Sequence, residues 1–335
     1  MSRKQKRGYE QNVKDIVECA LFPEVGVENG MGHAGGDGGL VLVRDLDLFS
    51  YCESCLLPFQ VKCHVGYIPS GKRVVGLSKL SRVADIFTKR LQNPQRLVDD
   101  ICFALQDGIN PTGVAVLLKC SHIHFPGFQS TNLDSNHERW VNVIVSSGSG
   151  SFEKRDSANW VDFFGLLRCR DMSLDHICSR TTIEDLWCPS WAKVGHSVSP
   201  MDTAVTSILQ SLGQDPCRKE LAGTPNMFVK WLTSFKDSKL EMKLNGLGCS
   251  PLKTVGDANC KIRSEVNLSV WSLCEHHLLP FYGSVHIGYI SSEEVNPISR
   301  AFLQSIVLFH GFKLQVQERL TRQIAETVSR LLGYW

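Results

Sequence analysis

An internal repeat constrains the fold of this chain more than any other feature of its sequence. Residues 51–68 read YCESCLLPFQVKCHVGYI and residues 273–290 read LCEHHLLPFYGSVHIGYI, with the same residue at 10 of 18 positions. The copies lie 222 residues apart, far beyond the period of about 20 to 50 residues that stacked repeats show. The sequence therefore predicts a tandem duplication of a whole domain, and 335 residues are enough to bury two cores.

Composition narrows the kinds of partner and compartment. With 36 basic and 34 acidic residues the net charge is +2, so we expect neither nucleic acid nor an anionic membrane as a partner. Thirteen cysteines, an odd number without the spacing of a small disulfide scaffold, favour a reducing compartment. No apolar run approaches the length of a membrane span, and no apolar segment follows the basic start MSRKQKRGYE. We therefore expect a cytoplasmic protein.

Hydrophobic periodicity predicts an α+β fold in the first copy. Alternation around Val61–Tyr67 indicates a strand, and three- and four-residue spacings over residues 77–105 indicate two helices, the second starting at Pro94. Alternation at residues 114–124 predicts another strand, with residues 141–147 as its hairpin partner.

The rest of the chain divides into a linker and a second domain. Residues 171–198 show no sustained period, whereas Ser199-Pro200 resembles a helix start. We therefore expect a first domain at 1–170, a linker at 171–198 and a second domain at 199–335. The second copy ends after its helices, without the strand pair of the first copy, so the second domain is predicted to be incomplete.

The second copy carries the residues best suited to chemistry. In Cys274-Glu275-His276-His277 a thiolate and an imidazole three residues apart can reach one zinc ion from a short turn. A catalytic zinc needs a third protein ligand and an open position, so another ligand must come from elsewhere. His276 would remain available as a general acid or base. The alternative is a polar turn whose histidines are satisfied by backbone carbonyls.

Together with LQVQERL at 314–320, the string CEHHLLPFYGSVHIGYI resembles GTP cyclohydrolase I. The resemblance covers roughly residues 12–165 and 200–335, and the tandem arrangement resembles the plant-type, two-domain form of that family. It implies two tandem T-fold domains, each an antiparallel sheet with paired helices on one face, in a homo-oligomeric ring. It also implies a zinc-dependent reaction on GTP that opens the purine at C8, releases formate and gives 7,8-dihydroneopterin triphosphate for folate synthesis.

The same resemblance implies roles for individual residues. Cys274 and His277 would bind zinc, and His276 would donate a proton to the opening imidazole ring. Gln317 and Glu318 would hold the guanine edge. In the first copy the family's GLSK motif stands at Gly76–Lys79, so that Ser78, Lys79 and Arg82 would hold the triphosphate.

Each copy lacks what the other keeps. Counting back from the LQ pairs, the second copy has Ala301, Phe302 and Ser305 at the phosphate positions. The first copy has Ser54, Cys55 and Gln95 in place of the acid histidine, a zinc ligand and the guanine-binding glutamate. Because active sites of the family form between subunits, the resemblance implies sites at inter-domain or inter-subunit interfaces.

The first copy also carries a second candidate metal site. The family's His-x-Cys motif stands here as His122-Ile123-His124, which makes His122 a further candidate catalytic residue. Cys52, Cys55 and His124 could then bind a structural or vestigial zinc ion. The alternative is that they are buried thiols and a hydrogen-bonded histidine.

Three functions remain open from the sequence. The leading one is GTP cyclohydrolase I activity. A second is a catalytically inactive subunit that assembles with the full-length enzyme and modulates it. A third keeps the fold but uses another purine or pterin, against which the GLSK and QVQERL motifs argue, since each matches one end of GTP.

Overall fold

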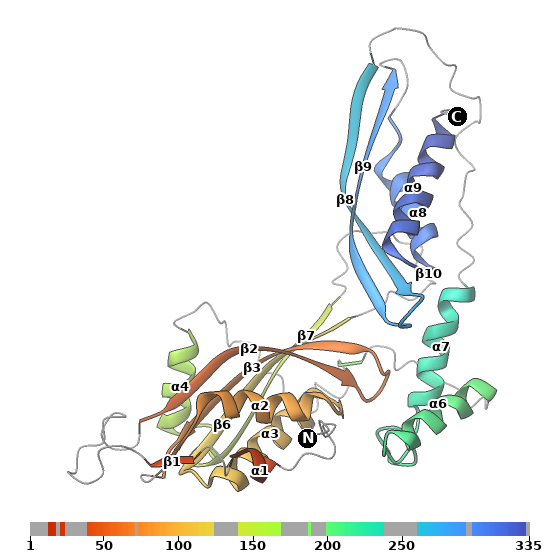
Figure 1. Ribbon diagram of the computed structural model, residues 1–335. Coiled ribbons are helices and arrows are strands. Elements are labelled where there is room, and N and C mark those ends of the chain that lie inside the picture. The colour runs from red at the N-terminus through yellow and green to blue at the C-terminus, as the bar shows by residue number, and fades with distance from the viewer. Residues whose placement is uncertain are drawn as a thin grey trace, which may run out of the picture. The chain divides into compact units, whose positions relative to one another are not determined.

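The computed structural model describes residues 13–17, 21–23, 39–70, 73–123, 140–168, 187–188, 199–237, 260–292 and 297–332. Contacts divide the chain into two compact units. The first contains the described elements from α1 to α6 and the start of α7, and the second contains those from β8 to α9 (Figure 1).

A five-stranded sheet forms the centre of the first unit. Its spatial order is β5-β2-β3-β6-β7, in which the short β5 runs parallel to β2 and the other neighbours are antiparallel. The bounds are β2 Val41–Cys52, β3 Pro58–Ile68, β5 Leu91–Gln92, β6 Gly113–Ile123 and β7 Trp140–Gly150. In β6 both alternating sets of side chains are buried, because helices cover both faces of the sheet at this strand.

Two helices cover one face of this sheet. They are α2 (Leu77–Thr88) and α3 (Pro94–Ile109), and α3 packs on β6 and β7. Pro94 occupies the first helical position of α3, where its missing N–H costs nothing, and the Asn93 side chain caps the helix. The short α1 (Val13–Val17) contacts both helices, and β1 (Leu21–Pro23) pairs with β4 (Arg73–Val75).

An aromatic cluster covers the other face. Helix α4 (Ala158–Arg168) places Trp160 and Phe163 against Ala115 and Leu117 of β6. The Trp160 indole N–H donates to the Phe152 carbonyl at 2.7 Å, so this large side chain is buried with its polar atom satisfied.

Two further helices follow in the sequence. Helix α6 (Pro200–Ser211) begins with a capping box, in which the Ser199 and Asp202 side chains each accept a backbone N–H of the other residue. The start of α7 (Thr224–Asp237) also belongs to the first unit, where Thr224 donates to the Glu53 carbonyl at 2.7 Å. The compact unit therefore extends beyond residue 199, where the sequence places the start of the second domain.

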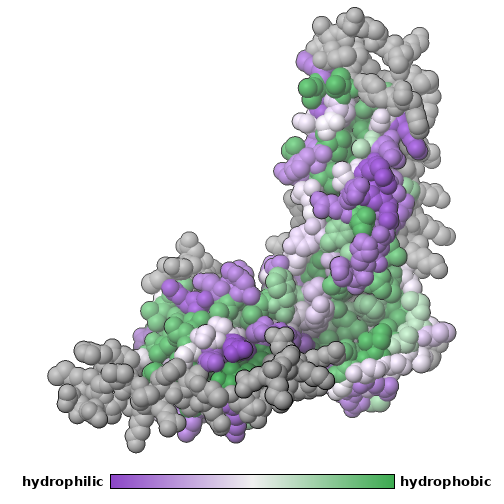
Figure 2. All heavy atoms as spheres, in the orientation of Figure 1, coloured by the Kyte–Doolittle hydropathy of each residue, from purple (hydrophilic) through white to green (hydrophobic). Residues whose placement is uncertain are grey.

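The second unit consists of a long hairpin and two helices. Strands β8 (Cys260–Cys274) and β9 (Pro280–Ser292) are antiparallel, and the short β10 (Leu314–Gln315) runs parallel to β8. Helices α8 (Arg300–Gly311) and α9 (Gln317–Leu331) bury Leu303, Ile306 and Leu320 against the hairpin. Figure 2 shows hydrophilic side chains over α9, on the face turned away from this core.

Fine details of the first unit recur in the second. Each long strand has a bulge whose left-handed residue, Asp45 or Asn267, donates its N–H to a histidine Nδ1 at 3.2 Å. Each hairpin turn has a leucine at positive φ, Leu56 at 59° and Leu278 at 52°. In each unit a tyrosine hydroxyl accepts a backbone N–H from a residue just before the first covering helix; these tyrosines are Tyr67 and Tyr289. In each unit a buried glutamine, Gln92 or Gln315, donates to a carbonyl of that helix.

These contacts fix which residues correspond. The residues that cap α2 and α8, Gly76 and Ser299, both precede the buried glutamine by 16 residues. Ala301 and Phe302 therefore occupy the positions of Ser78 and Lys79, as the sequence count predicts.

The predicted α+β class is confirmed, and the helices expected from Leu77 and Pro94 and the strand pair at 114–124 and 141–147 are present. In the part of the second unit that the structure describes, no strand pair follows α9. The described helices include none that is both long and apolar enough to cross a membrane.

Two glycines of the first unit make a matched test of its packing. A Cβ at Gly148 of β7 would lie 2.4 Å from the Phe152 carbonyl oxygen and 2.7 Å from a ring carbon of Trp160, whereas one at Gly165 of α4 would meet open space. We expect Gly148→Ala to lower the free energy of unfolding by about 1–3 kcal/mol. Gly165→Ala should raise it by about 0.4–1 kcal/mol. Urea unfolding followed by tryptophan fluorescence measures both, and equal midpoints would contradict the close approach at Gly148.

Candidate active site

The β8–β9 turn brings together the chemical groups of the second copy. Strand β8 ends at Cys274, and Leu278 closes the turn in the left-handed region with its N–H donating to the Cys274 carbonyl at 2.9 Å. A leucine at positive φ is costly, and such strain is concentrated at functional sites. The Cys274 Sγ lies 3.3 Å from the His277 Nδ1. The turn therefore aims a thiol and an imidazole at one point.

An ion pair holds this turn against the start of α9. Arg319 donates to both carboxylate oxygens of Glu275, at 2.7 and 2.9 Å. This hydrogen bonding lowers the pKa of Glu275 and raises that of Arg319. The Glu275 N–H also donates to the Gln315 carbonyl at 3.2 Å, next to the parallel pair of β10 with β8. The proposed guanine ligands at the start of α9 are thereby placed beside the turn.

The predicted catalytic and guanine-binding groups are open to solvent. His276 is 67% exposed at its side chain, with its Nε2 3.8 Å from a Glu275 oxygen. His277, Gln317 and Glu318 are exposed as well, whereas Cys274 is half-buried. Within the described ranges no third metal-binding side chain joins Cys274 and His277. The turn therefore offers two ligands and an accessible acid, as an incomplete catalytic metal site would.

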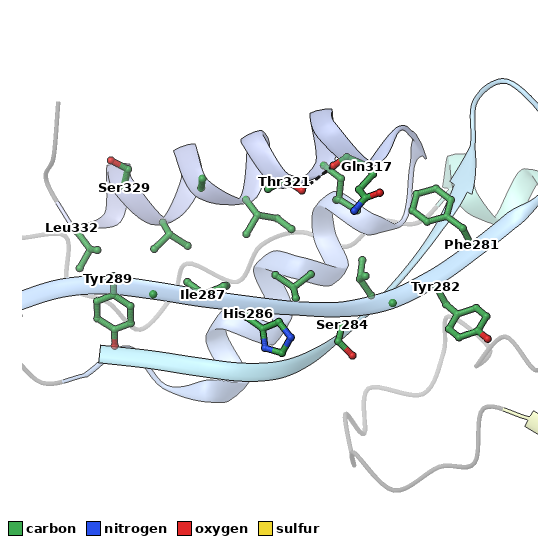
Figure 3. A pocket seen from close by; sticks show the side chains of 18 of the residues that line it. Phe281, Tyr282, Ser284, His286, Ile287, Tyr289, Gln317, Thr321, Ser329 and Leu332 are labelled. Atoms are coloured by element: carbon green, nitrogen blue, oxygen red, sulfur yellow. Dashed lines mark hydrogen bonds between the residues drawn. The ribbon is translucent and has the colours of Figure 1, made fainter. Parts of the chain in front are cut away.

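A groove of about 870 Å³ runs between β9 and α9 in the same unit. Figure 3 shows Phe281, Ile287 and Tyr289 of β9 on one side and Thr321, Ser329 and Leu332 on the other. In the first unit β6 pairs with β3, the counterpart of β9, and α3 packs on β6. The groove thus lies along the side of β9 that corresponds to the β6 side of β3, and Gln317 is among its lining residues.

The predicted phosphate ligands lie in the first turns of α2. Ser78 and Arg82 are exposed and Lys79 is half-buried. A hydroxyl and two cations near a helix N-terminus are suited to an anion. In the second unit the corresponding helix starts with Arg300, but its guanidinium binds Glu265 at 3.0 Å and the carbonyls of Val266 and Asn267 at 2.8 and 3.1 Å. Arg300 holds the bulge of β8 and leaves that helix start without an unengaged cation.

The corresponding turn of the first unit is buried. Cys52, Cys55, His122 and Cys188 are at most 3% exposed, and one donor atom of each lies within 4.8 Å of the others. The sequence pairs Cys52 and Cys55 with His124, which lies outside the described residues. The structure instead supplies His122, expected as a catalytic residue, and Cys188.

The pKa values of the thiols and of the imidazole in this cluster are shifted in different directions. Burial opposes ionisation of Cys52, but hydrogen bonds from Cys188 and Cys55 and the charge of His122 bring its pKa well below the usual range. Burial and the hydrogen bond with Cys188 raise the pKa of Cys55. Burial lowers the pKa of His122, but the hydrogen bond and charge of Cys52 outweigh it and raise that pKa overall. The cluster therefore stabilises the charged forms of Cys52 and His122 relative to an isolated buried thiol or imidazole.

Cys188 was not among the metal ligands predicted from the sequence. It lies between the two copies, in a segment without hydrophobic period, so that nothing local connects it with Cys52. Its neighbour Trp187, a large aromatic residue in the predicted linker, is a local signal of burial.

The Glu275–Arg319 pair can be tested without any ligand. We expect Arg319→Met to speed amide hydrogen exchange several-fold across residues 272–280, because the turn loses its attachment to α9. Arg322→Met is the matched control, since Arg322 is exposed and lies 4.0 Å from Glu326 on the same helix. Equal exchange in the two variants would show that the ion pair does not hold the turn.

Comparison with known proteins agrees with this arrangement. The profile of the GTP cyclohydrolase I family matches residues 9–159 and 201–334. The chain is 62% identical to GTP cyclohydrolase 1 of Solanum lycopersicum, over 99% of its own length and 74% of that protein. It is 55% identical to GTP cyclohydrolase 1 of Arabidopsis thaliana over 99% of its length and 72% of that protein. With two matched segments that include both hairpin turns, this chain belongs to the GTP cyclohydrolase I family.

Proposed function

We propose that this chain is a GTP cyclohydrolase I, which opens the purine ring of GTP at C8, releases formate and forms 7,8-dihydroneopterin triphosphate. The observation that carries the proposal is the β8–β9 turn, where Cys274 and His277 lie 3.3 Å apart beside the accessible His276. Family membership supports the same reaction.

The donors at this turn suit zinc. A thiolate sulfur and an imidazole nitrogen are the ligands that zinc takes in proteins, and a zinc ion there would activate water at neutral pH. Cys274 and His277 are the proposed ligands. A third ligand has to come from outside the described part of the second unit.

His276 is proposed to move the proton. Its imidazole is exposed and lies near the Glu275 carboxylate, which Arg319 holds in place. In this position His276 can donate a proton to the imidazole ring of the substrate as that ring opens.

The two ends of GTP are proposed to meet different residues. Glu318 can accept two hydrogen bonds from N1 and N2 of guanine, with Gln317 beside it, and bonds to a carboxylate are stronger than neutral ones. Ser78, Lys79 and Arg82 are the proposed triphosphate ligands, because the matching helix start of the second unit has Ala301 and Phe302 and an engaged Arg300. Turnover would then require residues of both copies.

We propose further that the chain consists of two tandem T-fold domains, at 1–170 and 199–335, joined by residues 171–198. The recurring bulges, turns and buried glutamines support a duplication. The second domain is proposed to be incomplete, which agrees with the unpaired side of β9 in the described residues. Assembly into a homo-oligomer and a cytoplasmic location belong to the same proposal.

A second function is favoured by one observation. Cys274 and His277 have no third metal-binding partner among the described residues. A chain of this kind could serve as a non-catalytic subunit that joins active members of the family and changes their activity.

Turnover of GTP separates the two functions. We expect the purified, zinc-supplemented chain to produce a pterin that becomes fluorescent after oxidation. His276→Asn should keep its zinc and lose activity about 10²- to 10⁴-fold, the usual contribution of a general acid. Cys274→Ser should lose both zinc and activity. No product from the zinc-loaded chain, together with co-elution with an active relative, would establish the non-catalytic subunit instead.

The phosphate ligands can be tested by one matched pair of lysines. Lys79 and Lys89 lie at opposite ends of α2, and Lys89 is paired with Asp85. Because a charged hydrogen bond contributes about 1.5–3 kcal/mol, Lys79→Ala should raise the KM for GTP about 10- to 100-fold. Lys89→Ala should leave it unchanged. Equal KM values for the two variants would remove Lys79 from the proposed site.

A further inference from the structure

The buried cluster in the first unit has four side chains of the kinds that bind zinc. Cys52 ends β2, Cys55 lies in the following turn, His122 lies on β6, and Cys188 comes from the segment between the copies. Three sulfur atoms and one nitrogen form one of the common ligand sets of structural zinc sites.

The separations of the four donor atoms fit a single ion. In a tetrahedral site with Zn–S near 2.3 Å and Zn–N near 2.0 Å, neighbouring donor atoms lie about 3.5–3.8 Å apart. In this structure all four lie within 4.8 Å of one another, and the Cys55 Sγ is 3.3 Å from the His122 Nε2. Small side-chain rotations would therefore bring them to a common centre.

The orientation of His122 fits a ligand. Its Nδ1 lies 2.6 Å from the carbonyl oxygen of Ile123, which can only accept a hydrogen bond. With the proton on Nδ1, the lone pair of Nε2 faces the thiols. Metal-binding histidines are commonly fixed in this way, by a carbonyl on the ring nitrogen that does not bind the metal.

The surroundings close the site to water. The Trp187 ring stands edge-on to His122 and to Phe59, at centroid distances of 5.0 and 4.9 Å. All four candidate ligands are buried. Four protein ligands and no open position are typical of a structural zinc ion, not of a catalytic one.

The charges beside the cluster also balance a zinc ion. Zinc with three thiolates and a neutral imidazole carries a net charge of −1, and the buried Glu53 adds another −1. Arg96 and Arg218 lie 3.1 and 2.9 Å from the Glu53 carboxylate and supply two positive charges. A buried negative centre needs such compensation.

We propose that the chain binds a structural zinc ion through Cys52, Cys55, His122 and Cys188. This ion is separate from the proposed catalytic zinc at Cys274 and His277. It fastens the segment around Cys188 to the β2–β3 turn, where Arg218 and Thr224 already attach the helices that follow. The chain between successive ligands, from Cys55 to His122 and from His122 to Cys188, spans 67 and 66 residues, and closing such loops stabilises the fold chiefly by restricting the unfolded chain.

The test begins with the catalytic turn disabled. We expect the full chain with Cys274→Ser and His277→Ala, purified in the presence of zinc, to contain about one zinc ion per chain. Elemental mass spectrometry measures this content. Adding Cys188→Ser should reduce this to about none, and Cys188→His, which keeps a zinc ligand, should restore it. Cys63→Ala is the matched control, because Cys63 is fully buried but outside the cluster.

Two readouts do not depend on whether the Cys188→Ser variant folds. When cobalt replaces zinc in the Cys274→Ser/His277→Ala variant, we expect the charge-transfer absorption of three thiolate ligands. Adding Cys188→His should reduce this absorption to that of two thiolates. Alkylation should modify Cys52, Cys55 and Cys188 after a chelator is added but not before, with Cys63 protected throughout.

Several results would overturn the proposal. One is the absence of both zinc and thiolate–cobalt absorption in the double variant. Another is a zinc content that Cys188→Ser does not reduce. A third is a disulfide among the three cysteines, detected by intact-protein mass spectrometry. The result is independent of GTP turnover, so failure of the proposed function would leave it standing.

Discussion

In each unit, a carboxylate bound to an arginine links the turn at the end of the long hairpin to a helix that follows more than 40 residues later. Glu53 binds Arg96 and Glu275 binds Arg319, at sequence separations of 43 and 44 residues. The short parallel strand lies beside this pair, and a turn N–H bonds a carbonyl of that strand. Because turn and helix are fixed together, the side chains of the turn and those at the helix start form one surface. The proposed roles of the residues in the β8–β9 turn and at the start of α9 depend on this link.

The turn at the end of the long hairpin is exposed in the second unit and largely buried in the first. In the second unit His276 and His277 are exposed, which suits a reaction that must admit a substrate and release products. In the first unit the equivalent positions are less exposed: Ser54 is half-buried, and Cys55 is buried beside Cys188. A cysteine at the position of His277, together with Cys188 as a fourth candidate ligand, favours a metal site closed to water. Under the two proposals, the first copy has lost its catalytic residues and gained metal ligands at the same turn.

Much of the fold could be predicted from sequence because its signals are local. Pro94 after Asn93 and Pro200 after Ser199 fix helix starts through backbone chemistry, and the alternation in β6 identifies a strand. The repeat then transferred each assignment to the other copy. Cys188 and Arg218 could not be found in this way, because their partners lie more than sixty residues away in the sequence and no local pattern links them. Burial of Glu53 by Arg218 and Thr224 is likewise a tertiary contact, which places α6 with the first unit and not with the copy that follows it.

The groove between β9 and α9 is poorly suited to the charged part of a nucleotide, although Gln317 lies at its edge. Its lining includes Val270, Phe281, Val285, Ile287 and Leu320, and contains no lysine or arginine. GTP carries several negative charges, which lose hydration when they are buried. An apolar wall without cations offers no interaction that would replace this hydration. A strand places apolar side chains along such a wall, and in the first unit β6 lies beside β3 and beneath α3. The polar turn at Cys274–His277, and not this groove, is the part of the described unit suited to a nucleotide.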